Sequence, residues 1–305
     1  MSENNIEKFE NEINIHQILE LLWNGKYVVI FTTVFTVALA VGISIYLPNV
    51  YRTEVLLFPV DDENSTNTNG LQLGQLGSLA SLAGVDLNQA GSSLKIKGIA
   101  TLQSRAFITE FLNSHELIVP FMASIPGDRD ASVQIDPSIY DVESGEWIRK
   151  VSPPMQIIPS DWEVYDEFSK ILNVDEDDET GLITVSLEWY DPNQIRIWLD
   201  WLIEDVNERM KIQDLNEAER AIDYLEGQLE RTQLVEMRNM FFNLIQQQTQ
   251  TIMLADVRDG YVFQIIDPPV VPQEHSSPNR AVIILLGFIL GVVLSLFWVF
   301  NAKQK

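Results

Sequence analysis

Two long runs of apolar residues lie near the two ends of the chain. The first is Tyr27–Leu47 and the second is Ala281–Phe300, and neither run contains a charged residue. Each is about 20 residues long, the length at which an α-helix crosses the hydrocarbon core of a bilayer. The pattern predicts two transmembrane helices, at 27–47 and 281–300, that flank a large central region, 48–280.

The basic residues around these runs predict their orientation. Four lysines lie on the outer side of the runs, and Arg52 and Arg280 are the only nearby basic residues on the inner side. Because cytoplasmic flanks carry the excess of Lys and Arg, both termini are expected in the cytoplasm, as tails at 1–26 and 301–305. The first run is not expected to be a signal peptide, since its leader is acidic and no small-residue cleavage site follows it. The four lysines are Lys8, Lys26, Lys303 and Lys305.

The longest helical pattern of the central region runs from Ile195 to Asp259. It has no proline and a single glycine, Gly227, and it is dense in residues that lose little side-chain freedom in a helix. Asp191 and Pro192 form a start signal, an N-cap followed by a residue whose missing N–H is not needed there. As one rod or coiled coil, this stretch would measure about 90–100 Å.

Three segments show the pattern of β-strands: Tyr51–Pro59, Leu182–Trp189 and Tyr261–Asp267. The first and third are close to an apolar run, so we expect both near the membrane, in one sheet with the second. The helical stretch leaves this sheet and returns to it, which a single rod cannot do. We therefore predict an unequal hairpin about half as high as the rod, with its tip near Thr232, where the heptad phase slips.

Shorter elements are predicted elsewhere. Ser93–Asn113 and Trp162–Leu172 are expected to be helices, 116–159 irregular α/β structure and 175–181 a turn. An amphipathic helix is expected within 1–25, and a loop or short helix at 71–87. The buried side of the helix at 93–113 is predicted to carry Ile96, Ile99, Leu102, Phe107, Phe111 and Leu112.

Together these elements predict an α+β membrane protein. Two transmembrane helices flank a domain outside the cytoplasm. This domain has a membrane-proximal α/β base, formed by 48–194 and 260–280, and a long helical hairpin over 195–259.

Charge and cysteine content exclude several classes of function. The formal net charge is −24, and nucleic acid is not expected as a partner, because neutralising phosphates needs clustered Lys and Arg. The chain has no cysteine, so it has neither a disulfide framework nor a thiolate metal site. The excess carboxylates are interpreted as a solvated surface.

Sequence motifs of catalysis and cofactor binding are absent. The chain has no GxxxxGK[ST] phosphate loop, no HExxH, no GxSxG and no glycine-rich dinucleotide turn. The histidines, His16, His115 and His275, are expected on two sides of the membrane and so in no common site. No catalytic residue and no cofactor is predicted.

The acidic segment 175–181 resembles the start of a calcium-binding loop. However, Thr180 stands where such a loop needs glycine, and Ser186 stands where it needs a bidentate glutamate. An ordinary turn is the favoured interpretation, and no metal site is predicted.

Three features point to packing rather than to chemistry. Gly287 and Gly291 form a GxxxG pattern, which lets helix backbones approach closely, although glycines are common in membrane spans. The polar helical segment Lys211–Arg220 favours contact with a neighbouring chain, since a monomer gains little from it. A proline-rich juxtamembrane segment, which is also a plausible spacer, contains Pro268, Pro269, Pro272 and Pro278.

Four stretches, in order along nearly the whole chain, carry a family resemblance. They are INIHQILELLWNGKYVVI with PNVYRTEVLLFPV, LKIKGIATLQSRAFITEF, WEVYDEFSKILNVDEDDETGLITVSLEWYDP and YVFQIIDPPVVPQEHSSPNRA. The chain resembles the chain length determinant family, the Wzz-type polysaccharide co-polymerases of Gram-negative inner membranes. The resemblance implies a bell-shaped ring of identical subunits in the bacterial inner membrane, with most of each chain in the periplasm.

The resemblance also implies a function without catalysis. Such a protein regulates the chain length of lipopolysaccharide O-antigen, or of a related surface polysaccharide, made by a Wzy-type polymerase. The implied partners are further copies of the chain, the polymerase, membrane lipid and the undecaprenyl-linked glycan.

Two departures from the family pattern leave alternatives open. The sequence ends at Asn301–Lys305, and so the branch without a cytoplasmic kinase domain is expected. The helical stretch also looks shorter than in the longest members. A structural adaptor for polysaccharide export, or a membrane activator of a separate tyrosine kinase, is the alternative function.

Overall fold

The structure is a computed structural model that describes residues 26–60, 90–127, 132–258 and 260–302. The chain divides into two compact units, which are described separately. The smaller unit consists of 1–49 and 276–305, and the larger one of 50–275. The fold is α+β, and two apolar helices flank the larger unit along the chain.

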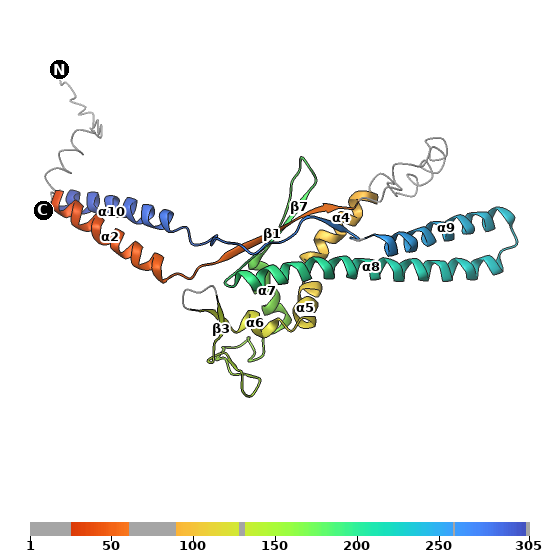
Figure 1. The fold of residues 1–305 in the computed structure, drawn as a ribbon, viewed down its shortest axis with the longest axis horizontal. Helices are drawn as coiled ribbons and strands as arrows, with labels where there is room; N and C mark the ends of the chain where they lie inside the picture. The colour runs from red at the N-terminus through yellow and green to blue at the C-terminus, as the bar shows by residue number, and fades with distance from the viewer. Residues whose placement is uncertain (1–25, 61–89, 128–131, 259, 303–305) are drawn as a thin grey trace, which may run out of the picture. The chain divides into compact units, whose positions relative to one another are not determined.

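The smaller unit contains the two apolar helices, α2 (Lys26–Tyr46) and α10 (Arg280–Ala302). They run antiparallel and lie side by side (Figure 1). Arg280 Nη2 donates a hydrogen bond to Asn49 Oδ1 at 3.0 Å, which ties the start of α10 to the residues after α2. Both helices are long and apolar enough to cross a membrane, and only 17% of each apolar window is buried. The two helices predicted from the apolar runs are confirmed.

The larger unit is built on a four-stranded antiparallel sheet with the order β6-β7-β1-β8. The predicted sheet of three strands is confirmed, but β7 has a further neighbour, β6, that the sequence did not indicate. The segment of β6 was assigned to the end of a helix and the start of a turn, and it contains only two apolar residues. The strands are β1 (Tyr51–Pro59), β6 (Leu172–Glu176), β7 (Ile183–Trp189) and β8 (Phe263–Asp267).

One face of this sheet forms the hydrophobic core. Alternate residues of β1 are buried, among them Val55 and Leu57, because successive side chains of a strand point to opposite faces. Helices α7 (Asp161–Ile171) and α8 (Pro192–Arg231) lie against the sheet, and Phe168 and Leu199 are fully buried in the same core. The first half of α8 therefore belongs to the core of the larger unit.

Helices α8 and α9 (Val235–Val257) form the predicted hairpin and lie side by side (Figure 1). Asp191 caps α8 by accepting hydrogen bonds from the backbone N–H groups of Asn193 and Gln194, and Pro192 is its first residue, as predicted. The predicted tip is confirmed, since α8 ends at Arg231 and Thr232 is its C-cap. The two arms are unequal, as predicted, since α8 has 40 residues and measures about 60 Å, whereas α9 has 23 residues and measures about 35 Å.

The single helix predicted over 93–113 is wrong. The structure has two helices there, α4 (Ala90–Leu102) and α5 (Arg105–Ser114), and Ser104 is the N-cap of the second. The apolar periodicity continues across the break, which hid it in the sequence. Ile96, predicted to be buried, is exposed, whereas Leu102, Phe107, Phe111 and Leu112 are buried as predicted.

The irregular region before α7 consists of short pieces. A short helix and two small hairpins precede α7: α6 (Ile118–Met122), β2 (Ser124–Pro126) with β3 (Val133–Ile135), and β4 (Tyr140–Asp141) with β5 (Glu146–Trp147). The expectations for 1–25 and 71–87 fall outside the described residues.

Candidate functional site

The two glycines of the GxxxG pattern lie at the contact between α10 and α2. A Cβ atom added to Gly287 would lie 2.5 Å from Cβ of Ala40, and one added to Gly291 would lie 2.8 Å from Cα of Thr33. Both distances are far below van der Waals contact, so a larger residue would push the helices apart. The glycines therefore permit the closest approach of the two apolar helices of one chain.

Small residues on α2 form the complementary face. Ala40 and Ser44 are buried on α2, and Ser295 is buried on α10. The hydroxyl groups of Thr36 and Ser295 donate to carbonyls of their own helices, at 3.0 and 2.7 Å, which satisfies them in an apolar setting. This α2 face is not predicted from the sequence, although its residues recur every three or four positions, at Thr33, Thr36, Ala40 and Ser44.

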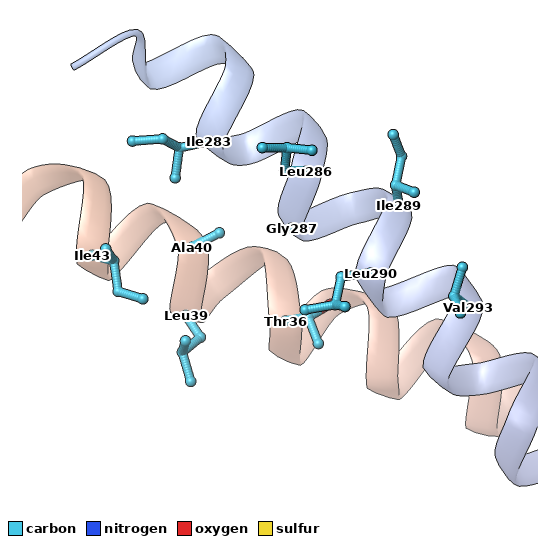
Figure 2. Close-up of a pocket in the computed structure, with 10 residues that line it drawn as sticks. All are labelled: Thr36, Leu39, Ala40, Ile43, Ile283, Leu286, Gly287, Ile289, Leu290 and Val293. Carbon is cyan, nitrogen blue, oxygen red and sulfur yellow. The ribbon is translucent and has the colours of Figure 1, made fainter. Parts of the chain in front are cut away.

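An apolar groove of about 450 Å³ lies between the two helices. Figure 2 shows Ala40 and Gly287 opposite each other beside this groove, with isoleucine and leucine side chains around them. No charged residue lines it, so it suits hydrocarbon and offers no group for acid–base or metal chemistry. The residues that line it are Thr36, Leu39, Ala40, Ile43, Ile283, Leu286, Gly287, Ile289, Leu290 and Val293.

The proline-rich segment follows β8 directly. Pro268 and Pro269 come after the last residue of the strand, and proline cannot donate a hydrogen bond to a sheet ladder. The segment is nevertheless held to the larger unit, since Thr53 Oγ1 donates to the carbonyl of Val270 at 2.8 Å. Pro272 and Pro278 follow, and Pro278 belongs to the smaller unit, just before α10.

The outer part of the hairpin is open. Every buried residue of α8 except Ala218 lies before Lys211, and Ala255 is the only buried residue of α9 among those whose side chains are described. Large apolar side chains are exposed here instead, namely Tyr224, Leu234, Val235, Met240, Phe242 and Met253. An isolated chain gains nothing from these apolar groups in water, so this surface fits contact with another molecule.

The return from the hairpin to the sheet depends on one side chain, Asn207, that was not predicted from the sequence. Asn207 of α8 accepts hydrogen bonds from the backbone N–H groups of Val262 and Phe263, both at 2.9 Å, through Oδ1. Its Nδ2 donates to the carbonyl of Phe263 at 3.0 Å. No sequence pattern marks this asparagine, because its partners lie more than fifty residues further along the chain.

His115 and several carboxylates in the described part of the chain are engaged in local contacts. His115 stacks on Trp201, with 4.5 Å between ring centroids, and its Nε2 lies 3.0 Å from Asp205 Oδ2. His275 is exposed in the proline-rich segment, and His16 falls outside the described residues. Among the described residues, no group of three or more metal-binding side chains is placed to hold an ion.

The segment that resembles a calcium loop is a turn. Asp177 Oδ1 accepts hydrogen bonds from the backbone N–H groups of Glu179 and Thr180, at 2.8 and 3.2 Å, and these bonds lower the pKa of Asp177. Asp175 is not in the turn as predicted but in β6, where its carboxylate accepts from Asn173. The carboxylates are thus engaged with their own backbone and neighbours.

Comparison with protein families gives two matches. Residues 11–115 match the model "Wzz: Chain length determinant protein", and residues 228–303 match "GNVR: G-rich domain on putative tyrosine kinase". The chain therefore contains a Wzz-type chain length determinant domain at 11–115 and a GNVR domain at 228–303. The Wzz match takes in α2, β1, α4 and α5, and the GNVR match takes in α9, β8 and α10. Each match thus contains one apolar helix and one of the two adjacent strands β1 and β8, which supports a membrane protein.

Two of the solved structures that match the chain are described as polysaccharide co-polymerases. A "full-length bacterial polysaccharide co-polymerase" is 12% identical, with a TM-score of 0.43, over 94% of this chain and 96% of that chain. A fragment of WzzB, a polysaccharide co-polymerase from Salmonella Typhimurium, is 10% identical, with a TM-score of 0.30, over 75% of this chain and 100% of that chain. No curated protein sequence matches the chain.

Proposed function

We propose that this protein is a non-enzymatic regulator of polysaccharide chain length, acting on lipopolysaccharide O-antigen or a related surface polysaccharide made by a Wzy-type polymerase. The match of 11–115 to the chain length determinant model carries this proposal. The groove between α2 and α10 supports it, since its lining is apolar and offers a packing surface.

The proposed location is the bacterial inner membrane, with α2 and α10 as its two spans. Both termini are proposed to lie in the cytoplasm and 48–280 in the periplasm, on the basis of the lysines outside the two apolar runs. Within one chain, Gly287 and Gly291 hold α10 against α2, and the juxtamembrane prolines Pro268, Pro269, Pro272 and Pro278 connect the sheet to α10.

The proposed mode of action is assembly. Copies of the chain form a ring-like homo-oligomer through the open face of the α8–α9 hairpin, where large apolar residues are exposed. Such a ring presents a fixed number of identical surfaces to the polymerase and to the undecaprenyl-linked glycan. The number of repeat units then depends on the assembly rather than on a chemical step in this chain.

Deletion of the gene tests the proposal. The polymer remains, but its length distribution on a lipopolysaccharide gel loses its preferred length, and expression of the full chain restores it. The matched control is the same plasmid with a stop codon early in the gene. A ladder that is identical with and without the protein would contradict the proposal.

A second candidate, a membrane activator of a separate tyrosine kinase, is favoured by one observation. The model that matches 228–303 is described as a domain on a putative tyrosine kinase. This function predicts that deletion lowers tyrosine phosphorylation of a partner on an immunoblot. Unchanged phosphotyrosine together with an altered polysaccharide ladder excludes the second candidate and supports the first.

A further inference from the structure

The loop between β5 and α7, residues 148–160, exposes several large apolar side chains. Ile148, Met155, Ile157 and Ile158 are 46–66% exposed, and Trp162 in the first turn of α7 is 63% exposed. Single exposed apolar residues are ordinary, but five of them within fifteen residues are not. This β5–α7 loop is therefore a second surface, separate from the hairpin, that suits contact with something other than water.

Arg149 draws the parts of the loop together. Its Nε and Nη2 donate to the carbonyls of Ile157 and Gln156, both at 2.7 Å, and its guanidinium also binds the carboxylate of Glu163 through both oxygens. Three segments are joined in this way: the start of the loop, its apolar end and the first turn of α7. The exposed isoleucines and Trp162 thus belong to one local surface with a defined backbone.

The charge of the loop contrasts with the rest of the chain. Residues 148–160 contain Arg149 and Lys150 and no carboxylate, in a chain of net charge −24. Arg149 compensates Glu163, and Lys150 is exposed. The exposed acidic residues Glu146 and Asp161 flank the loop on its two sides. Within the loop, Lys150 is a positive charge without a carboxylate beside it in sequence, whereas most of this protein is acidic and repelled by an anionic surface.

The register of the sheet relates the loop to the point where the chain enters the larger unit. Tyr51, the first residue of β1, pairs with Trp189, and Leu172, the first residue of β6, pairs with Leu187. Since α7 runs directly into Leu172, its C-terminal end lies at this end of the sheet, with Trp162 about 15 Å away along the helix. The chain between Tyr46 of α2 and Tyr51 measures at most about 17 Å.

We propose that the β5–α7 loop docks on the bilayer surface, with Ile157, Ile158 and Trp162 in the interface and Lys150 at anionic lipid headgroups. Tryptophan and aliphatic side chains beside a lysine are the composition that peripheral segments place at the boundary of headgroups and acyl chains. The inference rests on the membrane placement in the proposed function but not on the chain-length role. Contact with a second copy of the chain is the competing outcome.

The chain has no cysteine, so a single introduced thiol can be labelled in the full-length protein. A nitroxide is attached to Ile158→Cys in vesicles of phosphatidylethanolamine and phosphatidylglycerol, and its accessibility to oxygen and to a water-soluble nickel complex is measured. The control is Asp178→Cys, an exposed position in the turn between β6 and β7, at the end of the sheet opposite Tyr51. We expect high oxygen and low nickel accessibility at 158, and the reverse at 178.

Two other outcomes would overturn the inference. High nickel accessibility at 158 means that the loop lies in water, and low accessibility to both reagents means that protein covers it. Either result leaves the chain-length role intact, since that role is read from the polysaccharide ladder. Failure of the protein to float with the vesicles refutes the membrane placement itself, and the loop contact with it.

The lysine provides an independent test. Lys150→Ala is expected to lower the ratio of immersed to water-exposed label at 158 about fivefold in the anionic vesicles. This factor corresponds to the attraction that one basic side chain contributes near an anionic surface. In phosphatidylcholine vesicles, the same substitution is expected to have little effect. An equal response in both vesicles overturns the assignment to anionic headgroups.

Discussion

At the scale of single residues, three positions bring together parts of the chain that are separated in sequence. Gly291 allows α2 to approach α10 closely because it has no side chain. Asn207 of α8 bonds to the start of β8, and Arg149 of the β5–α7 loop bonds to Glu163 of α7. Each contact is specific in geometry, so each is open to a conservative test with a matched control.

Replacing Gly291 by leucine is expected to separate the two apolar helices. The added side chain meets Thr33 and Thr36, and overpacking of this kind typically costs about 1–3 kcal/mol. The thermal unfolding midpoint in detergent is expected to fall and the polysaccharide length distribution to broaden. The control is Gly42→Leu on α2, where an added Cβ meets no atom within 4 Å. Equal effects of the two substitutions would show that the close approach at Gly291 is unimportant.

Replacing Asn207 by alanine is expected to lower the free energy of unfolding by about 2–3 kcal/mol. The change leaves two backbone donors and one acceptor at the start of β8 without their partner. Hydrogen exchange at Val262 and Phe263 is expected to accelerate. The control is Asn216→Ala, whose side chain bonds only to the carbonyl of Ile212 in its own helix and is exposed. Unchanged exchange at β8 would contradict the role of Asn207.

The Arg149–Glu163 pair predicts a dependence of stability on pH. Hydrogen bonds from Arg149 are the main cause that lowers the pKa of Glu163. Because the folded pKa lies below the unfolded one, the pair stabilises the protein at neutral pH and loses this effect as the pH falls below about 4.3. Glu163→Gln is therefore expected to be less stable than the wild type at pH 7 and to approach it at pH 3.

Tryptophan fluorescence measures that unfolding, since Trp147 lies beside Arg149. The control is Glu167→Gln on the same helix, an exposed carboxylate whose removal is expected to change stability little at either pH. A stability difference for Glu163→Gln that stays constant between pH 7 and pH 3 would contradict the assignment.

At the scale of elements, the hairpin is the part with the least support from its own chain. The first half of α8 is buried in the core, whereas its second half and nearly all of α9 are open. Isolated helix pairs without a shared core are held mainly by contacts with neighbours, because helical propensity alone contributes little. Substitutions of the exposed apolar residues of α9 therefore test whether the chain self-associates through this helix.

Replacing Met240 and Phe242 together by aspartate is expected to weaken self-association. Two charges then occupy the apolar surface of α9, and a buried unpaired charge is strongly unfavourable. Light scattering on the detergent-solubilised protein, supported by particle images, is expected to show a smaller assembly. Gln246→Asp and Asn243→Asp add the same charge to exposed polar positions of α9 and serve as the control. An unchanged mass for the first variant would remove this face from the interface.

At the scale of the whole molecule, the helices and strands that have long or regular residue patterns can be predicted from the sequence. Uncharged runs reveal α2 and α10, alternation reveals β1 and β7, and the need to return to the sheet predicts the hairpin with its tip at Thr232. The strand β6 was missed because LNVDE has too few apolar residues to alternate clearly. The break at Ser104 was missed because buried residues on both sides keep a helical spacing.

The candidate site was only half predicted from the sequence, for a related reason. Gly287 and Gly291 can be recognised in the sequence because a spaced pair of glycines is conspicuous within an apolar run. Their partners on α2, Thr36 and Ala40, cannot be recognised in this way. A contact between two helices is a property of both, and which faces meet is decided by packing. The same holds for Asn207, whose importance comes from partners that fold back onto it.

The continuity of α8 has a mechanical consequence. One unbroken helix of 40 residues begins among buried side chains at Ile195 and ends at the tip of the hairpin, so it acts as a lever with its fulcrum in the core. The outer half of the helix, 211–231, is about 30 Å long, so a tilt of about 5° where it leaves the core moves its far end by about 3 Å. A small shift in the packing of the sheet is thus converted into a displacement of about one atomic diameter at the tip of the hairpin.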